Sequence, residues 1–252
     1  MQPKFANLKE SDVDIKQRQK YVTELFDNLA PNYDRFNRWV SFFRDETWRR
    51  KTIELLDDCK RGSVLDLAAG TGDLARSALK AGAQQVHVFD IAFNMLTQAK
   101  AKLRDENSQL SKINFELGSA ARLPFKDNSF DGIVSGFAMR NVFHFLDEVL
   151  SEMHRVLKPG GRFAILELSQ PKNSILRAGF RVHMKTIMPL IGKLTAGKST
   201  PFQYLCETTL TFLSPEEFKQ RLENAGFAGV SWKNFLFGGI AIHFGQKPIE
   251  SH

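Results

Sequence analysis

Residues 64–73 read VLDLAAGTGD, and the rest of the chain is organised around this stretch. The apolar run at 64–67 predicts a buried strand, and Gly70-Thr71-Gly72 predicts a tight turn after it. A helix then opens at Asp73. Glycines at such a turn let the backbone pass close to a ligand, at which the helix N-terminus points. The stretch therefore predicts a ligand-binding loop at the carboxyl end of a strand.

Strands and helices alternate on both sides of this loop. We predict strands at residues 63–67, 85–90, 113–117, 130–137, 162–168, 229–235 and 240–246. We predict helices at 15–30, where Pro31 ends the first one, then from Trp48, and at 73–81, 94–104, 145–156 and 215–225. Such alternation favours a parallel sheet with helices on both faces. The short glycine-rich link at 237–239 makes the last two strands a hairpin, so the last strand is antiparallel.

Composition sets broad limits on the class of protein. The chain has 252 residues, of which 42% are hydrophobic, and this suits one large domain. Two cysteines far apart fit a reducing cytoplasm. His87, His154 and His183 have no metal-ligand spacing with other ligands, so we assign no metal. The N-terminus lacks the apolar core of a signal peptide, and no apolar run reaches the length of a membrane span. A net charge of +7 favours an anionic partner, either nucleic acid or a membrane surface.

Carboxylates around the loop indicate which ligand it binds. The Gly-x-Gly-x-x-Ala pattern starting at Gly70, followed by Asp90, formally matches a dinucleotide fingerprint. However, Asp66 and Asp73 flank the loop and would repel a pyrophosphate. S-adenosylmethionine (SAM) has an ammonium, a sulfonium and a ribose but no phosphate, and suits these charges better. We expect Asp66 to face its amino-acid end and Asp90 its ribose. In the alternative, these carboxylates only cap a helix and end a strand.

Two segments outside the sheet are unusual. Residues 32–39 are rich in aromatic and polar side chains, which favours a cover over the site, with ordinary core packing as the alternative. Residues 170–200 contain no Asp or Glu, and their apolar residues alternate with Lys172, Arg177, Arg181, Lys185, Lys193 and Lys198. Such a basic amphipathic segment suits peripheral contact with an anionic membrane, or it is the solvated face of a helix packed on the domain.

Five motifs resemble the ubiquinone/menaquinone biosynthesis C-methyltransferase family, within the class I methyltransferases that use SAM. They are FDNLAPNYD at 26–34, LDLAAGTGD at 65–73, LPFKDNSFD at 123–131, SGFAMRNV at 135–142 and RVLKPGG at 155–161. The glycine loop and the Leu-Lys-Pro-Gly-Gly turn are general to class I enzymes. The segments at 140–142 and 30–34 are more specific to the quinone branch. At 201–203 the chain reads Pro-Phe-Gln, where many members read Ser-Tyr-Arg.

The resemblance implies an α/β, Rossmann-like fold with a seven-stranded, mostly parallel sheet whose last strand is antiparallel. It implies SAM as cofactor and a prenylated quinol, methylated on a ring carbon, as substrate. With the loop residues, the candidate cofactor-binding residues are Asp66, Gly70, Thr71, Gly72, Asp90, Ile91, Ser119, Ala120 and Ser135. We divide the single domain into an N-terminal helical cover (1–60), a cofactor-binding core (61–169), an inserted helical cap (170–213) and a C-terminal helix with hairpin (214–252).

Ring-carbon methylation needs an electron-rich nucleophile, which a quinol becomes when a hydroxyl loses its proton. We expect Arg140 to hold the phenolate, because a guanidinium stabilises the anion and lowers the quinol's pKa. We expect Asn141 to orient the hydroxyl or a water. The candidate substrate-binding residues, of which Asp34 and His144 are also candidate proton acceptors, are Tyr33, Asp34, His144 and Tyr204.

Three other interpretations stay open for the sequence alone. The acceptor could be another small aromatic or lipid molecule, or an RNA, or the chain could bind a ligand without catalysis. No RNA-binding motif accompanies the fold, so we expect no nucleic-acid partner. Demethylmenaquinol and a 2-polyprenyl-6-methoxy-benzoquinol are equally compatible with the motifs. We expect a cytoplasmic protein, and leave open a homodimer and a position on the inner face of the membrane.

Overall fold

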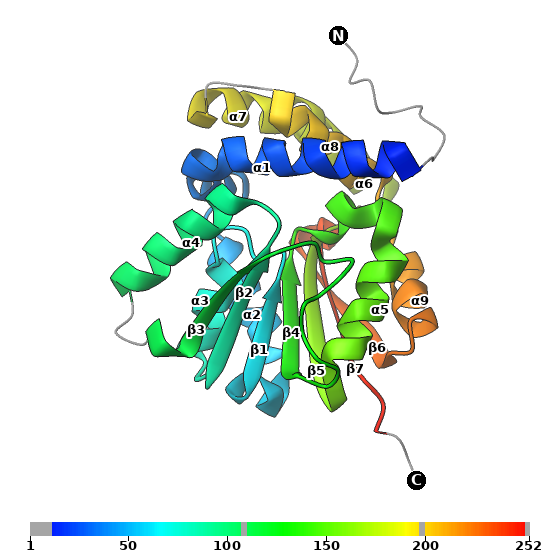
Figure 1. Ribbon diagram of the computed structural model, residues 1–252. Helices are drawn as coiled ribbons and strands as arrows, with labels where there is room; N and C mark the ends of the chain where they lie inside the picture. The colour runs from blue at the N-terminus through cyan, green and yellow to red at the C-terminus, as the bar shows by residue number, and fades with distance from the viewer. Residues whose placement is uncertain (1–11, 107–109, 197–199, 250–252) are drawn as a thin grey trace.

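The computed structural model describes residues 12–106, 110–196 and 200–249, and within them a single mixed sheet forms the centre of the molecule (Figure 1). Its strands are β1 (Ser63–Leu67), β2 (Gln85–Asp90), β3 (Ile113–Leu117), β4 (Phe130–Gly136), β5 (Leu157–Leu168), β6 (Ala228–Phe235) and β7 (Ile240–Gln246). Their order is β3-β2-β1-β4-β5-β7-β6, and β7 is antiparallel to both of its neighbours. The predicted fold is confirmed.

One strand begins earlier than predicted. Residues 158–161, which the sequence predicts as a turn, lie inside β5, because Leu157 already pairs with Phe130 of β4. The register shifts before Gly132 pairs with Arg162, and Gly160 takes a positive φ of 76°. The predicted turn is therefore an irregularity within a longer strand.

Alternation along the strands builds two cores. Val64 faces one side of the sheet, where it packs with α2 (Asp45–Glu54), α3 (Asp73–Lys80) and α4 (Phe93–Glu106). Leu65 and Leu67 face the other side, where they pack with α5 (Leu146–Val156) and α9 (Pro215–Asn224). Because both faces are covered, most buried positions of the central strands are apolar, and the buried carboxylates Asp66, Asp90 and Glu167 stand out among them.

A layer of helices lies across the carboxyl ends of the strands (Figure 1). It comprises α1 (Asp12–Val40), α6 (Ser174–Val182), a π-helical turn (His183–Ile187), α7 (Met188–Ala196) and α8 (Thr200–Thr211). Leu25, Leu29 and Phe36 of α1 share a small core with Met184 and with residues of α7 and α8. We call this layer the cover. The side chains of 201–203 and residue Lys198 lie outside the described residues.

The prediction that Pro31 ends the first helix is wrong, because α1 continues through it to Val40. Pro31 lacks the amide that would donate to the carbonyl of Asp27. Asn94 Nδ2 donates to that carbonyl instead, at 3.3 Å, and Asn94 N donates to Asp27 Oδ1 at 2.8 Å. Contacts with the start of α4 thus replace the lost helical hydrogen bond.

Candidate functional site

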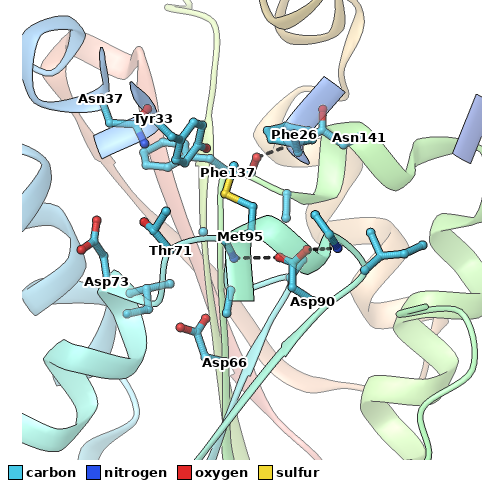
Figure 2. A pocket seen from close by; sticks show the side chains of 18 of the residues that line it. Phe26, Tyr33, Asn37, Asp66, Thr71, Asp73, Asp90, Met95, Phe137 and Asn141 are labelled. Atoms are coloured by element: carbon cyan, nitrogen blue, oxygen red, sulfur yellow. Dashed lines mark hydrogen bonds between the residues drawn. The ribbon is translucent and has the colours of Figure 1, made fainter. Parts of the chain in front are cut away.

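A cavity of about 100 Å³ lies between the cover and the carboxyl ends of β1 and β2 (Figure 2). Of the predicted cofactor-binding residues, it is lined by Asp66, Gly70, Thr71, Asp90 and Ile91. A smaller cavity of about 40 Å³ shares Asp90 and Ile91 with the first and is lined also by Ser119 and Ala120. The structure thus brings these residues together around one elongated site.

Gly70 and Gly72 shape the loop that floors this site. Both have positive φ angles, 56° and 76°, which residues with a Cβ rarely adopt. A Cβ added to Gly72 would lie 3.1 Å from the Cβ of Ala99 on α4. Gly72 therefore contributes through the turn itself, and it does not line either cavity.

Asp66 is a buried carboxylate at the bottom of the site (Figure 2). Its Oδ2 accepts a hydrogen bond of 2.7 Å from Ala75 N, in the first turn of α3. Its Oδ1 is buried and has no hydrogen-bond partner among the described residues. Burial, to which repulsion from Asp90 adds, raises the pKa of Asp66 to about 7. An unsatisfied acceptor of this kind fits a cationic ligand group.

Asp90 ends β2 and is held by two backbone amides. Gly70 N donates to Oδ2 at 2.7 Å and Ala92 N donates to Oδ1 at 2.8 Å. Burial raises the pKa of Asp90, and these two hydrogen bonds oppose the rise. Each carboxylate oxygen keeps a second lone pair, so ribose hydroxyls can still be accepted.

A chain of charges connects the cover to the glycine loop. Thr71 Oγ1 donates to Asp34 Oδ1 of α1 at 2.5 Å, and Lys102 Nζ of α4 lies 2.5 Å from Asp34 Oδ2. Lys102 also lies 2.8 Å from Asp73 Oδ1, and Arg49 of α2 lies 3.1 Å from Asp73 Oδ2. Asp34 therefore binds the loop from above, and it does not line any of the described cavities.

Of three further predicted cofactor-binding residues, Ser119 and Ala120 line the smaller cavity and Ser135 does not. Ser119 accepts a hydrogen bond of 2.8 Å from Gln19 Nε2 of α1, so the cover also reaches the far end of the site. Ala120 lies beside Ser119 in the same cavity wall. Ser135 is fully buried and donates to the carbonyl of Leu67 at 2.7 Å, between β4 and β1. Ser135 does not line the described cavities.

A second, larger cavity of about 360 Å³ lies under the cover. Its wall is mostly apolar, with side chains from α1, α2, α6, the π-helical turn, α8, β5 and β7. We call the cavities beside Asp90, of about 100 and 40 Å³, the cofactor-side cavities. Tyr33, Asn37 and Phe137 line both the large cavity and the first of these, so the two meet there. Phe137 has a positive φ of 59°, which is a strained conformation for a residue with a bulky side chain.

Arg140 is one of the charged residues in the wall of the larger cavity. It is buried and paired with the equally buried Glu167, near the end of β5. Glu167 Oε2 also accepts from Arg140 N at 3.3 Å, and its Oε1 accepts from Leu168 N at 2.9 Å. Arg140 Nε is buried with no partner among the described residues. The guanidinium is thus fixed on one side and retains an unused donor.

Of the remaining predicted residues, Tyr33 and Asn141 line the described cavities, whereas His144 and Tyr204 do not. Tyr33 is at the junction, and burial raises its pKa against the lowering effect of Arg140. Asn141 lines both cofactor-side cavities, donates to Phe137 O at 3.3 Å and has a buried Oδ1 without a partner among the described residues. His144 lies against Phe143, and Tyr204 packs edge-on against Tyr21, outside the described cavity walls.

Comparison with known proteins identifies the family. Residues 14–247 match the ubiE/COQ5 methyltransferase family. A demethylmenaquinone methyltransferase from Bacillus cereus is 37% identical over 235 residues, which cover 92% of this chain and 98% of that protein. This chain belongs to the ubiE/COQ5 methyltransferase family. It is a SAM-dependent C-methyltransferase.

Solved structures of low sequence identity support the fold alone. The [4+2]-cyclase SpnF aligns with a TM-score of 0.66 and 16% identity over 91% of this chain and 96% of its own. A SAM-dependent methyltransferase from Thermotoga maritima aligns with a TM-score of 0.62 and 18% identity, over 89% and 99%. The same fold therefore serves reactions of different kinds, and the acceptor must be argued from the site.

The site fits the cofactor of the family. The unpaired Oδ1 of Asp66 suits an ammonium group, and Asp90 stands at the end of the next strand, where ribose hydroxyls can bind. The sequence had not singled out Gln19, Lys102 or Glu167. Glu167 carried a visible signal, since an acid in the apolar run 163–168 parallels Asp66 in β1.

Proposed function

We propose that this enzyme transfers a methyl group to a ring carbon of a prenylated quinol. The observation that carries the proposal is the junction, at Tyr33, Asn37 and Phe137, of the cavity that contains Asp66 and Asp90 with the larger apolar one. A quinol ring at the junction would face the cofactor, and its prenyl chain would fill the apolar cavity. The similarity to enzymes named demethylmenaquinone methyltransferase supports this substrate class.

The cofactor would be held by the loop and by the two strand-end carboxylates. We assign the amino-acid end to Asp66 and the loop backbone, the ribose to Asp90, and the adenine end to Ser119 and Ala120. When bound, SAM supplies an electrophilic methyl group on a sulfonium. The contacts of the cover with Thr71 and Ser119 would exclude water and hold the site closed.

Arg140 and Asn141 prepare the acceptor. Arg140 presents an unused Nε donor, which suits a quinol oxygen that carries negative charge. Glu167 orients the guanidinium and is a positioning residue. Tyr33 keeps its proton, because burial raises its pKa, so it acts as a hydrogen-bond donor or ring contact. The quinol hydroxyl gives its proton to water, and the phenolate pushes electron density onto the neighbouring ring carbon. That carbon gains the methyl group, with S-adenosylhomocysteine as the other product, and then releases its own proton to water so that the ring regains its aromaticity. Positioning of this kind is worth about 7–11 kcal/mol in favourable cases.

The remaining expectations stand as proposals of the same account. We propose that residues 170–200 make peripheral contact with a membrane, since the substrate's prenyl chain partitions into lipid. Within the described residues no helix is long and apolar enough to cross a bilayer. We retain as a proposal the division into residues 1–60, 61–169, 170–213 and 214–252. The placement of α1 and of α6–α8 above the sheet supports it, although α2 of the first segment packs on one face of the sheet.

The test is an anaerobic incubation with methyl-labelled SAM and two chemically reduced acceptors, demethylmenaquinol and the ubiquinone-pathway benzoquinol. Mass spectrometry then locates the label. Label on a ring carbon of either quinol supports the proposal and identifies the ring. If SAM binds but neither ring is labelled, the methyltransferase assignment stands and the acceptor is another small aromatic or lipid molecule.

A further inference from the structure

Two turns beside the large cavity hold phenylalanines in strained, exposed positions. Phe42 and Phe43, between α1 and α2, have φ angles of 51° and 61°, and Leu236 and Phe237, between β6 and β7, have 48° and 55°. Consecutive residues with a Cβ rarely adopt this left-handed region. The exposed fractions of Phe42, Phe43 and Phe237 are 62%, 60% and 81%. Neither the packing of the core nor the cofactor site accounts for this arrangement.

The two turns lie on one rim of the cavity. Phe42, Leu236 and Phe237 line it, together with Ile175 and Leu176, which are also exposed. The ring of Phe42 lies 6.1 Å from that of His183 in the π-helical turn, and the glycine after Phe237 approaches Pro171. We call the exposed apolar residues around this opening the rim, namely Phe42, Phe43, Ile175, Leu176, Leu236 and Phe237.

Basic charge accompanies the rim. On the neighbouring helices Val182, Ile187, Leu190 and Leu194 are exposed at helical spacing. Arg181, Lys185 and Lys193 are exposed on the same segment, and within the described part of the chain none of them forms an ion pair. Residues 170–206 contain no Asp or Glu. An apolar surface with adjacent unpaired cations is complementary to the interface of an anionic bilayer.

We propose that the rim is a docking surface for an anionic phospholipid bilayer, into which the two phenylalanine turns insert. The cavity then opens toward the acyl chains, so that a prenyl chain passes into the protein without crossing water. The role of the opening rests on the proposed function, whereas bilayer binding does not. The inserted phenylalanines then lie in turns outside residues 170–200, whereas that segment contributes Ile175 and Leu176 beside them and its basic residues attract the headgroups.

The test is co-flotation of the full chain with vesicles of phosphatidylcholine, with or without phosphatidylglycerol. The variant replaces Phe42, Phe43 and Phe237 with Asn, because Asn tolerates the left-handed backbone and so preserves the turns. The matched control is Ile249→Ser, which removes an apolar side chain that is 73% exposed and lies beside Gly160, near the start of β5 and away from the carboxyl ends of the strands.

We expect wild type and Ile249→Ser to bind the anionic vesicles, and the triple Asn variant to bind at least about tenfold more weakly. Added salt should weaken wild-type binding. Thermal unfolding of the triple variant should be no lower than that of wild type, which excludes loss of the fold. Equal vesicle binding by the triple variant would overturn the proposal. So would a dimer of wild type that the Asn variant abolishes without any vesicle binding, because the rim would then bind a second copy.

A second readout separates this proposal from the proposed function. Phe43 does not line the cavity, so Phe43→Asn should lower turnover of a quinol embedded in anionic vesicles and leave turnover of a short-chain quinol in solution unchanged. Failure of vesicle binding by an enzyme that methylates quinols refutes the docking surface alone. Binding to vesicles without methylation of either quinol refutes the proposed function alone.

Discussion

Replacement of Asp66 by Asn should stabilise the cofactor-free protein at alkaline pH and weaken cofactor binding. Burial raises the pKa of this carboxyl to about 7 from an ordinary value of 3.8. The folded state therefore binds the proton more tightly than the unfolded chain does. The contribution of the Asp66 carboxyl to stability is complete below about pH 4 and is lost as the pH rises through about 7. The loss amounts to about 4 kcal/mol, since one unit of pKa is worth about 1.4 kcal/mol.

The Asn side chain keeps the acceptor for Ala75 N and does not titrate. Guanidinium unfolding of both proteins without cofactor should therefore show the stability difference shifting toward Asp66→Asn by roughly 3 kcal/mol between about pH 5 and about pH 8. Asp131 supplies the control, because hydrogen bonds from Lys158 and Ser63 N outweigh its burial and lower its pKa. Asp131→Asn should be less stable than wild type by a constant amount over that range. A constant difference for Asp66→Asn as well would refute the reasoning.

Cofactor binding gives the functional half of this prediction. A bound ammonium favours the ionised form of Asp66, so wild-type affinity for SAM should rise as the pH increases through about 7. Calorimetry in two buffers of different protonation enthalpy should detect proton release on binding near pH 6–7, that is, within roughly one pH unit of the pKa of Asp66. Asp66→Asn should bind more weakly and release no proton at this site. If its affinity equals that of wild type at every pH, Asp66 only caps α3.

Three further predictions follow from the geometry of the site. Arg140→Ala leaves Glu167 as a buried unpaired carboxylate, so urea unfolding should show a loss of about 3–5 kcal/mol. The double variant Arg140→Met with Glu167→Leu should recover most of that stability but not turnover, and wild-type turnover would contradict the role of the guanidinium. Lys102→Met removes the cation that bridges the cover and α3, so stopped-flow measurements should show SAM dissociating several-fold faster than from wild type. The control Lys100→Met changes an exposed neighbour and should match wild type. Equal dissociation rates for the two variants would contradict the bridging role of Lys102. Gly72→Ala combines left-handed strain with a close Cβ contact and should cost about 1–2 kcal/mol in thermal unfolding, with weaker SAM binding; an unchanged midpoint would show that the turn tolerates a side chain.

Local sequence signals predicted several of the residues that line the cavity at the ends of β1 and β2. Asp66 and Asp90 stand out because each is a carboxylate in an apolar run, and the glycines between them require a turn. The parallel register of β1 and β2 then brings Asp66 opposite Val88, so that the ends of both strands meet at one edge. Such an arrangement follows from alternation and handedness, and it could be predicted without knowledge of distant contacts.

The larger apolar cavity depends on contacts that no local pattern encodes. Arg140 pairs with Glu167 across 27 positions of sequence, and the apolar cavity forms only when α1 packs against α7 and α8. Pro31 shows the same limit, because Asn94 supplies a hydrogen bond that helix propensity cannot anticipate. For this reason Arg140 was predicted as a phenolate-holding group, but its buried partner was not.

The most direct test of the central claim is a crystal structure of the enzyme with S-adenosylhomocysteine and a short-chain demethylmenaquinol, prepared anaerobically. The account predicts the quinol ring at the junction of Tyr33, Asn37 and Phe137, with an oxygen toward Arg140 and the prenyl chain in the apolar cavity. A ring bound away from this junction, or a prenyl chain directed into solvent while the cavity under the cover stays empty, would contradict it.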